Sequence, residues 1–400
     1  MKGGNENSEV PQDQGRRKLV IAAGGVGALA VLFGGHATIF YRSLGDPSAS
    51  SPLYAGPFLD SDLQQAVETG FNHATEASDV IKGIDLQGKV IVMTGSHSGT
   101  GREAAKAMAS AGASIIALTR DVDRAKNNLT GVPNIEVEYL DLLVPSSIDD
   151  FAEKFLRSGR PIHVLINSAA IMGVPLQHDI RGYERHFENN VLGHFQLTAR
   201  LIPALERAGG ARIVNLSSRG HRAGNVNFSD INFKRTEYSG MRAYAQTKTA
   251  LSLLSVKEDA LFREKGIRAF AVHPGAVPST DLFAAGRVGF ASPYIVNLAR
   301  ANAKFVRATH MTEMLNALRR PRNVGDIYKT VQQGGATTTW AATSQALNNR
   351  GGLYLEDCNV AVMVPNGSSA PFGVRPWALD KSAADRVWDI CQEMTGVRIA

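Results

Sequence analysis

The sequence predicts an α/β protein built on a doubly wound parallel sheet. The prediction rests on four consecutive features between residues 89 and 119. Residues 89–94 form a short apolar run with β-branched side chains, which is typical of a buried parallel strand. A glycine-rich turn at 94–101 and a stretch of strong helix formers at 102–110 follow. A second apolar run at 114–119 completes a strand, turn, helix and strand. This arrangement is the dinucleotide-binding unit of the Rossmann fold.

Apolar runs farther along the chain extend the predicted sheet. We expect strands at 135–141, 162–166, 212–216 and 266–272, and a seventh at 352–355. With the first two strands they predict the order 3-2-1-4-5-6-7. Each strand ends in small or polar residues, and ligands bind at the carboxyl ends of the strands in open α/β sheets. The sequence therefore predicts a functional site along this edge.

The chain before residue 84 is organised differently. Residues 1–18 are polar and are expected to form a disordered tail. Residues 42–83 are expected to form a linker rich in Pro and Ser, followed by a short helix at 62–82. Residues 84–400 should form a single catalytic domain, with a substrate lid around 281–330.

Residues 19–41 form a hydrophobic segment of 23 residues without Asp, Glu, Lys or Arg. As a helix this segment would be roughly 34 Å long, enough to cross the core of a bilayer. It follows the basic residues 16–18, so three interpretations stay open. It is a transmembrane anchor of a membrane-associated protein, a cleaved export signal of the twin-arginine type, or a buried helix.

Composition and charge restrict the partners. Cys358 and Cys391 are the two cysteines, so no disulfide framework is expected, and we expect no metal site. The net charge is +6, and residues 287–329 carry eight Lys and Arg against two Asp and Glu, an excess that equals the whole net charge. No nucleic-acid motif accompanies this basic stretch, so we expect no nucleic-acid partner.

The lid region combines this charge with apolar side chains. They are Phe283, Phe290, Tyr294, Ile295, Leu298 and Phe305. One interpretation is a core helix with solvated arginines. The other is a cover over a pocket for a lipophilic substrate, which also contacts a membrane surface.

The three glycines of the turn have separate predicted roles. Gly95 should allow the tight turn, Gly99 should let the backbone approach a pyrophosphate, and Gly101 should let the helix pack on the strand. The helix N-terminus then presents free N–H groups and a positive dipole to the phosphates. Arg120 follows Thr119 at the end of the second strand, where an acidic residue would bind the ribose of NAD. An arginine there favours the 2′-phosphate of NADP over NAD.

The reactive groups are predicted within residues 244–248. Tyr244 and Lys248 are four residues apart on a helix and share one face. A free Tyr titrates near pH 10, so we expect the Lys248 cation and an oxidised nicotinamide to lower the pKa of Tyr244. Ser218, at the end of the fifth strand, can donate a hydrogen bond to a substrate oxygen.

These motifs resemble, in order along residues 80–400, the short-chain dehydrogenase/reductase family. The resembling segments are 94–101, 167–170, 217–218, 244–248 and 274–275. Longer segments at 187–198, 212–221 and 351–358 are similar to the retinol dehydrogenase and WW-domain oxidoreductase branch. Relatives in this family are dimers or tetramers, so a homodimer or homotetramer is expected.

The resemblance implies a catalytic tetrad of Asn190, Ser218, Tyr244 and Lys248. Tyr244 would be the acid/base, Ser218 would polarise the substrate oxygen, and Lys248 would hold the ribose hydroxyls. Asn190 would bend its helix and hold a water of the proton relay. Asn189, Ser217 and Tyr238 are neighbouring candidates, of which Tyr238 is rejected because Arg242, not Lys, follows it by four residues.

The predicted cofactor contacts follow from the strand ends and from the same motifs. They are Thr94, Gly95, Ser98, Gly99, Thr100, Gly101, Arg120, Asp141, Leu142, Asn167, Ala169, Tyr244, Lys248, Pro274, Gly275 and Val277.

Three departures from the family pattern are visible. Ala170 replaces a glycine, Thr247 replaces the usual serine, and residues 278–280 carry one residue more than expected. The last change leaves open which residue would contact the nicotinamide amide. None of the three removes a catalytic group.

The sequence therefore predicts an NADP(H)-dependent oxidoreductase that interconverts an alcohol and a carbonyl. The substrate would be a small lipophilic molecule such as a retinoid, a steroid or an aldehyde. Two alternatives stay open: a non-catalytic, membrane-tethered nucleotide sensor or scaffold, and an isomerase or dehydratase on the same fold.

Overall fold

The computed structural model describes residues 59, 61–62, 64–282, 293–309, 311–319 and 327–399. The chain divides into residues 1–47 and a compact unit of residues 48–400, and the described residues belong to the second unit. The predicted tail at 1–18 and the hydrophobic segment at 19–41 lie outside the described residues. Within the described ranges, no helix is both long and apolar enough to cross a membrane.

A single sheet forms the centre of the unit. Its strands are β1 Val90–Thr94, β2 Ser114–Thr119, β3 Ile135–Tyr139, β4 Val164–Asn167, β5 Ala211–Leu216, β6 Ile267–His273, β7 Leu353–Glu356 and β8 Asn359–Val360. Their order is β3-β2-β1-β4-β5-β6-β7-β8, which confirms the predicted order of the first seven. The short β8 pairs antiparallel with β7 and was not predicted.

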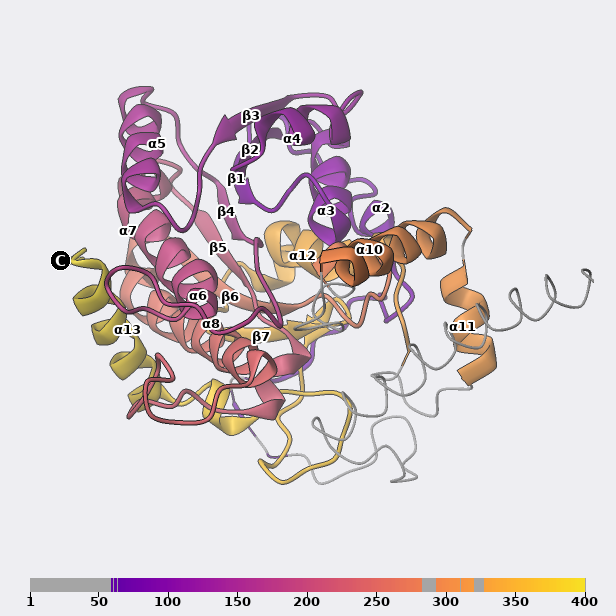
Figure 1. Ribbon diagram of the computed structural model, residues 1–400. Coiled ribbons are helices and arrows are strands. Elements are labelled where there is room, and N and C mark those ends of the chain that lie inside the picture. The colour runs from indigo at the N-terminus through magenta and orange to yellow at the C-terminus, as the bar shows by residue number, and fades with distance from the viewer. Residues whose placement is uncertain are drawn as a thin grey trace, which may run out of the picture. The chain divides into compact units, whose positions relative to one another are not determined.

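Helices cover both faces of this sheet (Figure 1). One face carries α5 Pro145–Arg157, α7 Gly193–Glu206, α8 Gly240–Phe262 and α13 Lys381–Thr395, and the other carries α2 Ala77–Val80, α3 Gly99–Ser110 and α12 Val331–Thr343. Along β1, Val92 belongs to the first core and its neighbours Ile91 and Met93 to the second. Burial on both faces explains why the strands read as continuous apolar runs.

Two glycines bring α12 against the dinucleotide unit. A Cβ on Gly335 would lie 3.0 Å from the backbone nitrogen of Ala104, and one on Gly334 would lie 2.4 Å from Cγ2 of Thr100. Larger residues would therefore separate α12 from α3. This close contact fixes the first turns of α3 against α12.

The predicted helix at 62–82 is wrong over most of its length. Among the described residues of this range only α2 is helical, and a turn at residues 73–74 precedes it. Gly70 has φ +70°, and Asn72 closes a turn with Thr75. The side chain of Asn359 bonds both backbone groups of Val67, at 2.9 and 2.8 Å. These hydrogen bonds to β8 satisfy the backbone groups of Val67 without a helix, so tertiary structure overrides helix propensity.

The predicted lid contains α10 Pro293–Ala308 and α11 Met311–Arg319. Leu298 and Phe305 on α10 are 53% and 55% exposed, whereas Ala303 and Val306 are buried. Phe283 and Phe290, and the side chains of Tyr294 and Ile295, lie outside the described part of the chain. An exposed apolar pair seven residues apart occupies one side of α10.

Candidate active site

The glycine turn has the predicted backbone geometry. Gly95 and Gly99 have φ of +69° and +56°, which side chains disfavour. A Cβ on Gly101 would lie 2.4 Å from the carbonyl oxygen of Gly95, so the turn requires glycine there. The structural roles predicted for Gly95 and Gly101 agree with this geometry. Contact of Gly99 with a pyrophosphate stays a prediction.

The mouth of this turn fits an anionic ligand. Ser98 is the N-cap of α3 and makes no side-chain cap bond, so the first N–H groups of the helix remain available to an anion. Nδ1 of His97 is buried and has no hydrogen-bond partner among the described residues. Burial, followed by the field of Arg124, lowers the pKa of His97. Free donors and a cationic surround are what a dinucleotide phosphate needs.

Thr94 holds the loop after β4 and does not face the turn's mouth. Its Oγ1 accepts hydrogen bonds from the backbone nitrogens of Ser168 and Ala169, at 2.9 and 3.1 Å. It also lies 2.9 Å from Nε2 of His194. The Thr94 hydroxyl is committed to these hydrogen bonds, and contact of Thr94 or Ala169 with a cofactor stays a prediction.

His194 connects that clamp to Asn190. Its Nδ1 lies 2.9 Å from the carbonyl oxygen of Asn190, which can only accept, so Nδ1 carries the proton. Nε2 then accepts from the hydroxyl of Thr94. Burial lowers the pKa of His194 to about 4, which keeps this ring neutral. His194 was not predicted as a site residue, although its position four residues after Asn190 on a helix was available as a signal.

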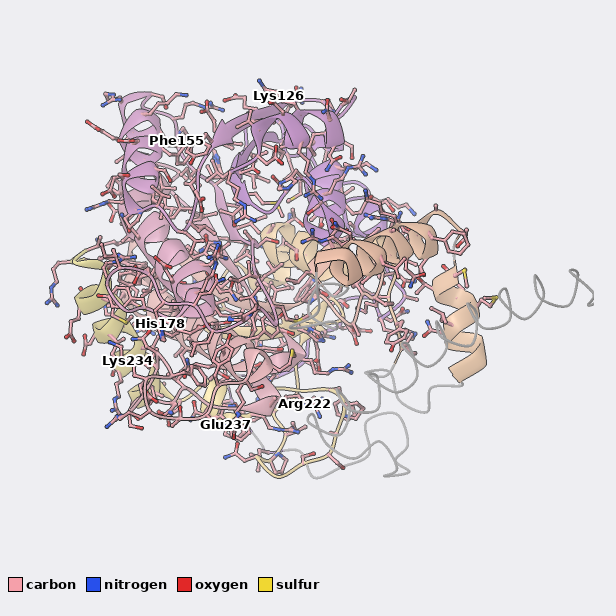
Figure 2. The ribbon with its side chains drawn as sticks, in the orientation of Figure 1. Lys126, Phe155, His178, Arg222, Lys234 and Glu237 are labelled. Carbon is pink, nitrogen blue, oxygen red and sulfur yellow. The ribbon has the colours of Figure 1, made fainter. Side chains whose placement is uncertain are left out.

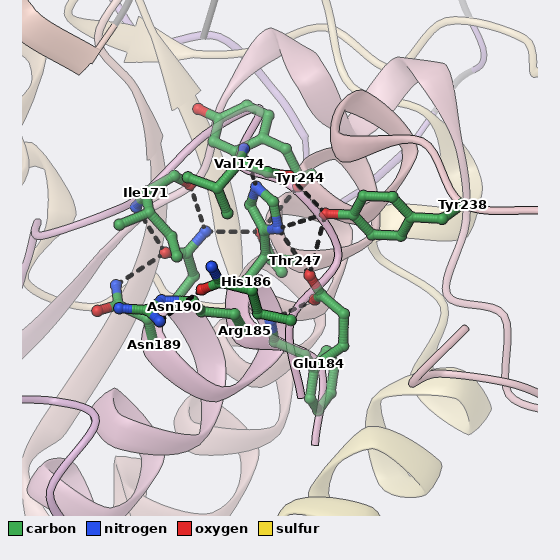
Figure 3. A network of polar contacts seen from close by, with 12 residues as sticks. Ile171, Val174, Glu184, Arg185, His186, Asn189, Asn190, Tyr238, Tyr244 and Thr247 are labelled. Carbon is green, nitrogen blue, oxygen red and sulfur yellow. Dashed lines mark hydrogen bonds and ion pairs between the residues drawn. The ribbon is translucent and has the colours of Figure 1, made fainter. Parts of the chain in front are cut away.

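Asn190 bends its helix as predicted. It lies in the π-helical turn η1 Glu188–Leu192, between α6 Arg185–Phe187 and α7. Its side chain pairs with both backbone groups of Ile171, at 2.9 and 3.0 Å, and donates to Oγ1 of Thr247 at 3.1 Å (Figure 3). Asn189 only supports it, through a 3.0 Å bond to its Oδ1. Thr247, one of the departures from the family pattern, is thus a partner of the tetrad.

Tyr244 and Lys248 lie in one turn of α8 and are both buried, at 5% and 2% exposure. The Lys248 Nζ lies 5.4 Å from the centroid of the Tyr244 ring and donates to the carbonyl oxygen of Leu216 at 2.5 Å. A Cβ on Gly220 would lie 3.0 Å from Cε1 of Tyr244, so a glycine makes room for this ring. The predicted pair is therefore assembled beside the end of β5.

The charge states differ from the expectation. Burial raises the pKa of Tyr244 to about 12, and its hydrogen bond with Ser218 opposes this only in part. Burial also lowers the pKa of Lys248 to about 7. In this structure burial has a larger effect on the pKa of Tyr244 than any attraction by Lys248, and the expected effect of an oxidised nicotinamide stays a prediction. Tyr244 is a protonated phenol that can donate.

The rejected candidates have structural partners. Tyr238 donates to the carbonyl oxygen of Val174 at 2.7 Å and contacts the buried pair of Glu184 and His186 (Figure 3). Ser217 donates to the carbonyl oxygen of Lys248 at 2.7 Å and is 2% exposed. By contrast, Oγ of Ser218 accepts from the Gly220 nitrogen at 3.0 Å, which leaves its own hydrogen for another acceptor.

Other predicted cofactor residues on the first half of the sheet serve as supports. Asn167 donates to Thr198 and Asn215, and its buried Oδ1 has no partner among the described residues. Oδ1 of Asp141 accepts from the Leu143 nitrogen at 3.0 Å, which shapes the loop after β3. Leu142 is buried, with its carbonyl 2.5 Å from where a Cβ of Gly193 would lie, and the methyl of Thr100 faces Gly334.

The loop after β6 returns to the glycine turn. Pro274 leads into Gly275, whose φ is +91°, and a Cβ there would lie 2.5 Å from Cδ of Lys329. Val277 is buried, and its carbonyl accepts from Oγ1 of Thr280 at 2.9 Å. Cγ2 of Thr280 lies 3.3 Å from where a Cβ of Gly99 would be. The extra residue at 278–280 therefore still brings a threonine to the turn.

Arg120 is exposed at the end of β2 and makes no hydrogen bond or ion pair within the described ranges. Its charge acts on His97, so it lies at the mouth of the turn. Arg124, from α4 Val122–Asn128, pairs with Asp281 at 2.9 Å beside the same histidine. Arg124 was not predicted as a site residue.

Comparisons with known proteins identify the family of this chain. A model of the short chain dehydrogenase family matches residues 89–287. Retinol dehydrogenase 12 of Mus musculus is 30% identical over 325 residues, which cover 79% of this chain and 89% of that protein. The WW domain-containing oxidoreductase of Homo sapiens is 30% identical over 343 residues, which cover 82% of this chain and 76% of that one.

A solved structure has the same fold. It is an uncharacterized protein from Mycobacterium paratuberculosis, with a TM-score of 0.58 and 24% identity, and the match covers 82% of this chain and 99% of that one. The family's fold implies a nicotinamide cofactor, which the open glycine turn accommodates. The chain belongs to the short-chain dehydrogenase/reductase family of oxidoreductases, in the branch that resembles the retinol dehydrogenases.

Proposed function

We propose that this protein is an NADP(H)-dependent oxidoreductase that interconverts an alcohol and a carbonyl on a small lipophilic molecule. The observation that supports it best is the buried pair of Tyr244 and Lys248 beside Ser218, with the glycine turn at the same edge of the sheet. A module that only binds nucleotide has no use for such a pair.

The proton chemistry belongs to Tyr244. Its pKa near 12 keeps the phenol protonated, so it can donate to a carbonyl oxygen while that oxygen gains negative charge. Ser218 donates a second hydrogen bond to the same oxygen. The nicotinamide, when bound, supplies or accepts a hydride at C4. Lys248, held by the Leu216 carbonyl, presents its amine toward the face of the Tyr244 ring.

Asn190 and His194 fix the geometry around this proton donor. The Asn190 amide holds Ile171 and Thr247, and Thr247 in turn donates to the carbonyl oxygen of Tyr244 at 2.8 Å. A reacting group must be held within a fraction of an ångström of its productive position. These contacts tie the loop after β4 to the helix that carries Tyr244.

The preference for NADP rests on Arg120. It is exposed, uncommitted to any partner in the described residues, and next to the mouth of the glycine turn. Thr119 before it offers no carboxylate to the ribose hydroxyls of NAD. A guanidinium in this position binds the 2′-phosphate in bidentate form.

The proposal extends to the membrane. Leu298 and Phe305 form an exposed apolar pair on α10, and Arg300 and Lys304 are exposed between them. A basic amphipathic helix of this kind binds anionic lipid surfaces. An anchor at residues 19–41 would strengthen this membrane binding.

Vesicle flotation tests this extension. The full chain should float with vesicles that contain phosphatidylserine. After deletion of residues 19–41, the remaining flotation should be sensitive to salt and should disappear with Arg300→Glu and Lys304→Glu. A full chain that stays out of the vesicle fraction would contradict the proposed membrane association.

Cofactor titration and turnover on the full chain test the enzymatic proposal. NADPH and NADH are titrated by fluorescence and then mixed with retinal, a ketosteroid and octanal. We expect tighter binding of NADPH and its consumption with at least one carbonyl. If NADPH binds but no member of a broad carbonyl panel leads to its consumption, the result would favour a nucleotide sensor. Conversion of substrate without net cofactor turnover would favour an isomerase or dehydratase.

A further inference from the structure

Two buried arginines lie close to Ser218, beyond the carboxyl end of β5. Arg222 belongs to the 3₁₀ turn η2 Arg219–Ala223, which begins directly after Ser218, and is 8% exposed. Arg375 comes from the loop after β8 and is 2% exposed. Burial, followed by the fields of Arg375 and Arg219, lowers the pKa of Arg222 to about 9. The guanidinium groups of Arg222 and Arg375 therefore share one neighbourhood.

Three buried nitrogen atoms of these two side chains have no hydrogen-bond partner among the described residues. Nε of Arg222 and both Nε and Nη1 of Arg375 are buried without a partner among the described residues. Nη2 of Arg375 donates to the carbonyl oxygen of Ser368. Arg222, labelled in Figure 2, makes no side-chain hydrogen bond or ion pair in the part of the chain that the structure describes. Buried guanidinium groups without partners are costly, so such an arrangement indicates a binding site for an anion.

The carboxyl group of Glu356 compensates for the two arginines only in part: its field opposes the lowering of their pKa values, but it forms no ion pair with either. Glu356, at the end of β7, accepts from the Gly373 nitrogen at 2.7 Å and is in no ion pair among the described residues. Burial, followed by the field of Asp357, raises the pKa of Glu356 to about 7, so near neutral pH it is only partly ionised. Lys329 and Asp357 neutralise each other at 2.5 Å. A positive excess remains around the two arginines.

Structural arginines in this fold look different. Arg212 is partly buried, and its guanidinium donates to the carbonyl oxygens of Ala341 and Ser344, at 2.8 and 2.6 Å, and to Asn348 at 2.7 Å. Arg268 binds both carboxylate oxygens of Asp259, at 2.8 and 2.9 Å. Arginines that serve packing here are satisfied, so a structural role does not explain Arg222 and Arg375.

The arginine pair is rigidly connected to the catalytic serine through His221. Nδ1 of His221 donates to the carbonyl oxygen of Ser218 at 2.7 Å, and its Nε2 accepts from the backbone nitrogen of Arg375 at 3.2 Å. The His221 ring also packs on Tyr354, at 4.8 Å between centroids. At about 2 Å rise per residue, the four steps of η2 separate Ser218 from Arg222 by roughly 8 Å of backbone.

We propose that Arg222 and Arg375 bind an oxyanion, a carboxylate or a phosphate, carried by the substrate at the end away from its reacting carbonyl. This inference rests on the proposed function, and it makes the substrate an amphiphile with one anionic group. An oxyanion accepts from several guanidinium N–H groups at once, which satisfies the orphaned donors and balances the charge.

Binding to the full chain in the presence of NADPH tests the site independently of turnover. Octanoate, its neutral analogue octanol, and inorganic phosphate are titrated by calorimetry. We expect octanoate to bind at least about tenfold more tightly than octanol, which is a difference of about 1.4 kcal/mol. Arg222→Gln and Arg375→Gln should remove this preference. Arg157→Gln should keep it, because Arg157 is 66% exposed and pairs with Glu153 on the distant α5.

A folding control and a turnover comparison complete the test. Arg222→Lys keeps the charge and should retain part of the preference, and near-UV circular dichroism shows whether each variant is folded. ω-Oxo-octanoate should then be reduced with a lower KM than octanal. Equal binding of octanoate and octanol to the wild-type chain would overturn the proposal. Phosphate binding as tight as octanoate would keep the anion site but overturn its assignment to the substrate. Anion binding without reduction of either aldehyde would leave the site intact and count against the proposed reaction.

Discussion

Two buried polar regions flank Tyr244, and they are satisfied to different degrees. On one side, the network of Asn190, Thr247, His194 and Thr94 is neutral, and its hydrogen bonds run from 2.8 to 3.1 Å. On the other side, Arg222 and Arg375 are charged and leave buried nitrogens without partners among the described residues. The first region is complete without a ligand, and the second is not.

The difference separates positioning from binding. A fully bonded network has one low-energy arrangement and holds the loop after β4 and the helix of Tyr244 in register. A buried pair of guanidinium groups lowers stability unless an anion completes it. Evolution keeps such a destabilising feature where a ligand supplies the missing interaction. The following changes break or sharpen this contrast.

Replacement of Tyr244 by Phe removes the proton donor between the two regions and should have the largest effect. We expect turnover to fall by about 10²–10⁴-fold, the usual contribution of a general acid. Cofactor binding should be kept, because the glycine turn is untouched. NADPH fluorescence titration and steady-state rates measure both. Tyr238→Phe is the matched control, since its hydroxyl serves Val174 and the Glu184–His186 pair. Near-wild-type rates for Tyr244→Phe would refute the assignment.

Asn190→Ala breaks the satisfied network. It leaves the backbone nitrogen and oxygen of Ile171 without their partner, and each such loss costs about 1–3 kcal/mol where the group is shielded from water. Urea unfolding should show the loss, and turnover should fall with it because the loop after β4 moves. Asn189→Ala removes only one supporting hydrogen bond and should change much less. Equal effects of the two variants would show that Asn190 has no special role.

Glu356→Gln tests the charge balance of the arginine side. The pKa of Glu356 is raised from 4.5 to about 7, so the folded protein keeps a proton that the unfolded chain releases in this range. Its contribution to stability is therefore present at pH 4.5 and below, and is lost as the pH rises to 7. Each tenfold difference in proton affinity between the two states corresponds to about 1.4 kcal/mol. The free energy of unfolding of Glu356→Gln, relative to that of the wild type, should therefore be larger at pH 8 than at pH 5. The same difference at both pH values would contradict this.

Arg120→Gln tests a cation that, unlike Arg222 and Arg375, is exposed to solvent. Its charge therefore carries no desolvation penalty. We expect about tenfold weaker NADPH binding, or about 1.4 kcal/mol, with NADH binding unchanged. Titration of both nucleotides measures the selectivity. If NADPH and NADH weaken together, Arg120 supports the turn and does not read the 2′-phosphate.

The predictable parts of this molecule are those that one stretch of chain builds. The glycine turn, the pair of Tyr244 and Lys248, and the sheet order follow from local spacing, because strand, turn and helix signals are short-range. The bend at Asn190 was implied by the family resemblance and appears as η1. The predicted helix at 62–82 failed because Asn359, far along the chain, bonds the backbone of Val67.

The pairing of Arg222 with Arg375 could not be predicted from the sequence for the same reason. Arg222 and Arg375 come together only through folding, and nothing in the sequence around them indicates that either is buried. The raised pKa of Tyr244 could not be predicted either, since spacing places Lys248 nearby but does not reveal the depth of burial that raises this pKa. Burial and long-range pairing are properties of the packed structure.

The central claim is that this site transfers a hydride between a nicotinamide and a carbonyl carbon, with Tyr244 as proton donor. The most direct test gives the full chain NADPH deuterated at C4, together with octanal and ω-oxo-octanoate, and analyses the alcohol by mass spectrometry. We expect one deuterium on the carbinol carbon of the product, absent with Tyr244→Phe. Alcohol formed without deuterium from either face of the labelled cofactor, or no alcohol despite tight NADPH binding, would contradict the claim.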